Sequence, residues 1–142
     1  MIYLDMIKYF WKEVDILDNF LYHKENIKNF AVTTIINCRR MYNLLSDELD
    51  SKKINEHALY GYHSMAYSTF ITMKGYYLQN DELSTWEIDT FIEKFEQFSR
   101  EFISSRGTSH SMQWTFGYYN ELVESYNTLA RLLELNPVEV PE

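Results

Sequence analysis

Apolar residues recur along most of the chain at intervals of three and four, the spacing that places side chains on one face of an α-helix. The same spacing recurs in residues 2–21, 55–79, 84–106 and 111–134. The clearest stripe consists of Ile27, Phe30, Ala31, Thr34, Ile35, Cys38, Met41, Tyr42 and Leu45. Because short connections make neighbouring helices antiparallel, the pattern predicts an all-α fold, an up-and-down bundle of about five antiparallel helices.

Residues typical of helix ends lie between these segments. The apolar stripe is interrupted at residues 22–26, which predicts a break between the first two helices. Ser84 stands three residues before Glu87, the pattern of a capping box at a helix start. Gly107 is the residue type that most often ends a helix, so we expect the fourth helix to stop there.

The helix expected at 55–79 differs from the others because it is almost uncharged. Lys74 is the only formally charged residue between His57 and Asn80, and apolar side chains fall on more than one face. A helix that is apolar most of the way round is usually surrounded by protein. We therefore expect this helix to form the centre of the bundle or, alternatively, a dimer face.

Small residues form a narrow strip along the same helix. They recur at intervals of three and four, and the strip consists of Gly61, Ser64, Ser68, Thr72 and Gly75. Small side chains in register let a second helix approach closely. The strip therefore predicts either tight packing inside the monomer or the seam of a homodimer.

Aromatic residues make up 17% of the chain, and several are adjacent in sequence. Adjacent helical residues point about 100° apart, so some of these rings must lie outside the core. Exposed Tyr and Trp side chains are typical of binding hot spots. The candidate binding residues are Tyr60, Tyr67, Trp114 and Tyr118, although each could equally form a polar-tipped edge of the core.

Length and charge limit the classes of function. The 142 residues favour a single domain, and we expect it to span 1–135 with a flexible acidic tail at 136–142. A net charge of −8 disfavours direct nucleic-acid binding and favours a basic protein partner. Residues 81–101 hold seven acids and two cations, which form either an ordinary solvated helix face or a mimic of nucleic acid.

The single cysteine, Cys38, fits a reducing compartment, and no run of apolar residues is long enough to span a membrane. We therefore expect a cytoplasmic location. No histidine pair has the spacing that puts two metal ligands on one helix face, and there is no glycine-rich phosphate loop. We expect neither a metal nor a cofactor.

One pair of residues could carry chemistry. Arg106 and His110 are separated by three residues, and a cation beside an imidazole can act on a phosphate group. This pair is similar to the Arg and His found late in the higher-eukaryote-and-prokaryote nucleotide-binding family, helical bundles of which many are RNases. The family's motif has a longer spacer. The resemblance implies a nuclease or nucleotide-binding bundle, whereas the Gly and Ser residues between the two favour a junction of two capped helices.

With no complete catalytic set, the sequence favours a non-enzymatic module that acts through protein–protein contact. Small acidic bundles rich in aromatic residues suit immunity proteins, antitoxins and phage-encoded inhibitors, and this assignment is made by exclusion. The alternative is the helical-bundle enzyme that would use Arg106 and His110.

Overall fold

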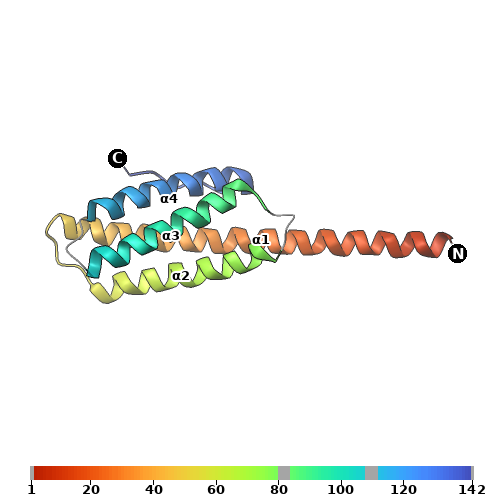
Figure 1. Ribbon diagram of the computed structural model, residues 1–142, viewed down its shortest axis with the longest axis horizontal. Coiled ribbons are helices and arrows are strands. Elements are labelled where there is room, and N and C mark those ends of the chain that lie inside the picture. Colours follow the sequence, from red (N-terminus) through yellow and green to blue (C-terminus); the bar gives the residue numbers. More distant parts are fainter. Residues whose placement is uncertain (1, 80–83, 108–111, 142) are drawn as a thin grey trace.

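The computed structural model describes residues 2–79, 84–107 and 112–141, and in these ranges the chain is almost entirely helical (Figure 1). Each helix runs opposite to the one before it. The elements are α1 (Ile2–Leu49), α2 (Glu56–Leu78), α3 (Trp86–Gly107) and α4 (Met112–Leu133). The predicted all-α bundle of antiparallel helices is confirmed.

The first two helices expected from the sequence are one continuous helix, so the predicted break at 22–26 is wrong. Helix α1 runs through this stretch without interruption, and the Asn26 side-chain amide donates to the Tyr22 carbonyl over 2.9 Å. None of residues 22–26 is Gly or Pro. Extending an existing helix orders one more residue for each backbone hydrogen bond gained. No residue in this stretch interrupts that extension.

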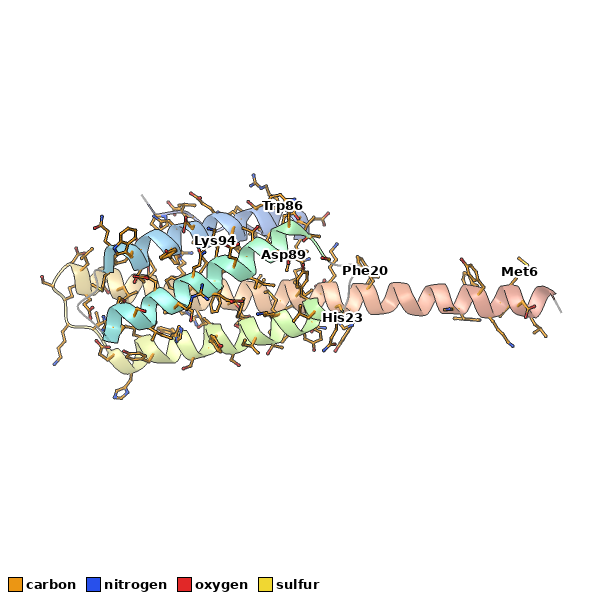
Figure 2. All side chains as sticks on the ribbon, viewed as in Figure 1. Met6, Phe20, His23, Trp86, Asp89 and Lys94 are labelled. Atoms are coloured by element: carbon orange, nitrogen blue, oxygen red, sulfur yellow. The ribbon has the colours of Figure 1, made fainter. Side chains whose placement is uncertain are left out.

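The first part of α1 extends beyond the rest of the bundle. Figure 1 shows this segment reaching out past the ends of the other helices, and Figure 2 places Met6 near its far end and Phe20 where it meets the bundle. We call residues 2–19 the arm. At 1.5 Å per residue it is about 27 Å long.

The bundle consists of two helix hairpins that share one core. Helix α1 packs chiefly on α2, and α3 packs chiefly on α4. Aromatic rings join the hairpins: Phe70 stacks on Phe95 with ring centroids 4.2 Å apart, and Tyr42 stacks on Tyr119 at 4.6 Å. The predicted stripe of 27–45 faces this core, where most of its members are buried.

The sequence predicts α2 at the centre of the bundle or, alternatively, at a dimer face. The central position is wrong. Five of its 23 residues are buried, whereas nine of the 22 residues of α4 are. Its buried side chains lie on one face, towards α1 and α3, and its opposite face is exposed. The lack of charge on α2 therefore does not reflect burial within a single chain.

Specific backbone contacts end the helices. Ser51, at φ 63°, closes α1 through hydrogen bonds from Ser51 N to Glu48 O and from Lys52 N to Asp47 O. Helix α3 is capped by Thr85, whose hydroxyl accepts from Ile88 N over 3.3 Å, and so the cap is one residue later than the predicted Ser84.

The residues after α4 lie along the bundle. The Asn127 side chain donates to the Val138 carbonyl over 2.8 Å and accepts from the Val138 amide over 2.7 Å. Val138 also packs against the core. This part of the chain is therefore held on α4 by both polar and apolar contacts.

Candidate functional site

The arm exposes an unusual amount of apolar surface. Five of its described apolar side chains are more than half exposed: Leu4 58%, Met6 66%, Tyr9 66%, Phe10 60% and Trp11 59%. Contiguous apolar surface of this kind on a folded protein marks an interaction site. The sequence predicted the amphipathic helix but not its exposure, because the pattern of a helix shows which face is apolar and not what covers it.

The apolar face of the arm does not continue the buried face of α1. Successive helical residues are rotated by 100°. On that spacing Phe10, Val14 and Leu21 lie about 90–130° from the side that Ile27 and Cys38 present to the core, whereas Tyr9 lies on that side. The exposed apolar side chains of the arm therefore point in several directions around the helix.

The exposed face of α2 is the second apolar surface. Its large side chains are about half exposed or more: Tyr60 46%, Met65 50%, Tyr67 49%, Ile71 46% and Leu78 67%. Lys74 lies at the edge of this face beside Tyr67 and Ile71, and its ammonium is 3.1 Å from the Glu96 carboxylate. The only formal charge that borders the outer face of α2 between residues 57 and 79 is that of Lys74, which is paired with Glu96, in a chain of which 24% of residues are charged.

The small-residue strip lies on this outer face. Gly61, Ser64, Ser68 and Thr72 are exposed and Gly75 is half-buried. A Cβ added at Gly61 or Gly75 would meet nothing within 4 Å. The strip therefore does not serve tight packing inside the monomer, which corrects the first of its two interpretations, while its use as a dimer seam stays a prediction.

The four candidate aromatic residues fall on two separate surfaces. Tyr60 and Tyr67 belong to the outer face of α2. The ring centroid of Tyr60 is 5.8 Å from that of Phe102 of α3, and the ring centroid of Tyr67 is 6.4 Å from that of Phe95. Trp114, 59% exposed, and the half-buried Tyr118 are on α4. With Gly117 and Glu121 these two line a shallow hollow of about 270 Å³.

Arg106 is bound by carboxylates at the end of the bundle. Its guanidinium forms ion pairs with Glu48 at the end of α1 and with Glu56 at the start of α2, and one of its contacts with Glu48 measures 3.1 Å. Its side chain is 13% exposed. Hydrogen bonding to Glu48 raises the pKa of Arg106 further above its usual value. The cation therefore joins three helices.

His110, the other half of the candidate catalytic pair, lies outside the described residues. The structure therefore gives no distance between Arg106 and His110. The Ser109 and Ser111 caps expected before the last helix also lie outside the described residues.

Two further polar contacts link the hairpins. His63 of α2 is hydrogen-bonded through Nε2 to the Ser99 hydroxyl of α3 at 2.8 Å, and burial lowers the pKa of His63. Tyr77 of α2 donates to the Asp89 carboxylate of α3 over 2.7 Å. Asp89 and Glu96, two of the seven acids in residues 81–101, thus take part in contacts between helices.

The remaining candidate groups are buried or dispersed. Cys38 is fully buried, and burial raises the pKa of its thiol well above the usual range. Among the residues that the structure describes, no three His, Cys, Asp or Glu side chains are grouped so as to hold a metal ion. None of the described helices is long and apolar enough to cross a membrane.

We compared the chain with protein-family models, with curated proteins and with solved structures, and none of the three comparisons found a match. Functional reasoning therefore depends on the surfaces of the molecule itself.

Proposed function

We propose that this chain is a non-enzymatic module that acts through protein–protein contact, using the apolar side chains of its arm and of the outer face of α2. The observation that carries the proposal is the exposure of Leu4, Met6, Tyr9, Phe10 and Trp11 on a helix that leaves the bundle. An amphipathic helix that inserts its apolar face into a groove is a recurrent mode of protein recognition.

The ion pairs of Arg106 support this proposal over the alternative of a nuclease. A catalytic cation must be available to a substrate phosphate, but Arg106 is bound by Glu48 and Glu56 and is mostly buried. Two carboxylates beside it also disfavour the approach of an anionic substrate. We assign Arg106 a structural role at the junction of three helices.

Affinity capture from the native host, followed by quantitative mass spectrometry, tests the proposal. The baits are wild type, Phe10→Glu and Lys12→Glu. Residues 10 and 12 are both exposed on the arm but lie on different faces. Losing an aromatic anchor costs about 2 kcal/mol or more, so Phe10→Glu should weaken binding of at least one protein, this chain included, by roughly 30-fold. Lys12→Glu should retain it.

Identical protein sets from both variants would contradict the proposed use of the arm. A parallel assay on RNA and DNA addresses the enzyme alternative. Wild type should cleave neither RNA nor DNA. The double variant Arg106→Ala/His110→Ala should retain the biological activity of the protein in its native host. Cleavage by wild type that the double variant lacks would instead establish the nuclease.

A further inference from the structure

Residues 135–141, which we call the segment, lie in a groove between α1 and α4. After α4 the chain turns back along that helix, and Val138 contacts the side chain of Asn127. The last three residues of the segment then line a hollow with Arg39 of α1 and Tyr119 of α4. The segment therefore runs antiparallel to α4. We call the surface beneath it the α1/α4 groove.

The groove binds the segment through its backbone. Asn127 donates to the Val138 carbonyl over 2.8 Å and accepts from the Val138 amide over 2.7 Å. Both contacts use main-chain groups, which every residue type except proline offers. Pro137 and Pro141 favour extended backbone at themselves and at the residues before them. The groove thus holds an extended chain by main-chain hydrogen bonds, a recurrent mode of peptide recognition.

A second asparagine of α4 stands on the same face without a hydrogen bond to its oxygen. Asn120 precedes Asn127 by two helical turns, which places it within about 20° of the same direction and about 10 Å along the axis. Its Oδ1 is buried and accepts no hydrogen bond from any residue that the structure describes. Three residues of extended chain also cover about 10 Å, so the residue at this level is Pro141.

Pro141 cannot satisfy that oxygen, because proline has no N–H group. The hollow that Pro141 lines also includes Tyr119, the neighbour of Asn120 in the chain, which agrees with this level. A buried acceptor without a donor costs free energy. An extended chain with an N–H group at the position of Pro141 would remove that cost.

The segment also fills the groove incompletely. A hollow of about 470 Å³ remains between α4 and the side chains of Leu135 and Pro137. Another of about 170 Å³ remains beside residues 139–141. Val138, between the two hollows, is only half-buried. Larger side chains on either side of this position would therefore bury more surface.

The charges along the groove favour an acidic occupant. Among the described residues that line the hollow beside residues 139–141, the helices contribute one charged side chain, Arg39, and the segment contributes Glu139. At the other hollow Arg131 is balanced by Glu124. A carboxylate at the position of Glu139 would therefore be attracted to the groove.

We infer that the α1/α4 groove is a docking site for an extended, acidic segment of a partner protein, and that residues 135–141 cover the site until that segment displaces them. The partner's segment has a backbone N–H group at the position of Pro141 and a carboxylate at the position of Glu139. The inference goes beyond the proposed function, because neither the arm nor the outer face of α2 forms part of this groove.

Release of the segment is the first measurement. In the full chain, Val138→Pro removes the N–H group that Asn127 accepts and keeps an apolar side chain. NMR spectra should then show residues 135–141 at the chemical shifts of a free peptide of the same sequence, with the helical content of wild type. Val138→Thr keeps both the shape of the side chain and the N–H group, so it should leave the segment in place.

Peptide binding to the released variant is the second measurement. The probe is a fluorescein-labelled peptide of residues 134–142 with the change Pro141→Ala. It should bind Val138→Pro saturably and bind wild type about tenfold more weakly or worse, because the attached segment competes at an effective concentration of about millimolar. Adding Asn127→Ala to Val138→Pro should weaken binding about tenfold or more. Adding Asn29→Ala, at an exposed asparagine of α1, should not.

Two changes in the peptide test the chemistry of the occupant. Restoring Pro141 should weaken binding about fivefold, and Asn120→Ala in the protein should abolish that difference. Glu139→Lys in the peptide should also weaken binding, and Arg39→Ala in the protein should reduce this effect.

Four results would overturn the inference. The segment could remain in place in Val138→Pro, or the released variant could bind no peptide at the highest concentration reached. Asn127→Ala and Asn29→Ala could bind the peptide equally. Finally, a wild-type dimer that Val138→Pro converts into single chains would show that the occupant is the segment of another copy.

Discussion

At the residue scale, the role of Arg106 illustrates what a sequence can and cannot show. Its place at the end of a helix was predicted from the neighbouring Gly107, and α3 does end there. Its partners Glu48 and Glu56 are 58 and 50 residues away in the chain, so no local pattern indicates them. The sequence suggested a contribution to the helix end, whereas the structure shows an ion-pair cluster that holds three helices together.

Arg106→Ala should lower the free energy of unfolding by about 1–3 kcal/mol, because hydrogen bonds to charged groups contribute more than neutral ones and the carboxylates lose their cation. Denaturant unfolding measures the effect. Arg100→Ala is the matched control: its side chain is 71% exposed and its carboxylate partner is 3.9 Å away, so we expect a change within about 0.5 kcal/mol. Equal effects for both variants would contradict the structural role of Arg106.

His63 should make stability depend on pH. Burial holds its pKa below the value of 6.5 that it has when unfolded. As the pH falls through 6.5, the unfolded chain takes up this proton first, so the free energy of unfolding should decrease. His63→Gln should flatten the profile between pH 7 and pH 5, whereas exposed His57→Gln should leave it unchanged. If the free energy of unfolding of His63→Gln depends on pH as steeply as that of wild type, His63 is not the source of the pH dependence.

At the element scale, the sequence predicted the helical segments but divided α1 in two and did not show what covers each face. The interruption of the apolar stripe at residues 22–26 was interpreted as a break, but α1 leaves the bundle there without a break in the helix. Similarly, α2 has the composition of a surrounded helix, and one chain covers only one of its faces. Periodicity identifies apolar faces from nearby residues. The surface that covers each face is set by distant residues or by another chain, which a local pattern cannot show.

Two neighbouring residues of α2 test the orientation of this helix. Phe70 is 1% exposed and stacks on Phe95, whereas Ile71 is 46% exposed. In dilute solution, Phe70→Ala should lower the free energy of unfolding by about 3–5 kcal/mol. Ile71→Ala should change it by no more than about 0.5 kcal/mol. A larger loss from Ile71→Ala than from Phe70→Ala would mean that α2 faces the bundle with its other side.

At the scale of the whole molecule, the arm and the outer face of α2 are two apolar surfaces that the described part of the chain leaves exposed. An exposed arm and an uncharged helix face are both liabilities for an isolated chain. The hollow at Trp114 and Tyr118 on α4 is a separate candidate surface for another protein.

The mass of the protein in solution tests the central claim most directly. Sedimentation velocity over a range of concentrations should show the full chain at twice its mass of 17.1 kDa, with dissociation on dilution by mass action. Phe10→Glu and Ser68→Leu, which change the arm and the outer face of α2, should each sediment as a single chain while keeping the helical content of wild type. A wild type that remains at 17.1 kDa at the highest concentration reached would contradict the account.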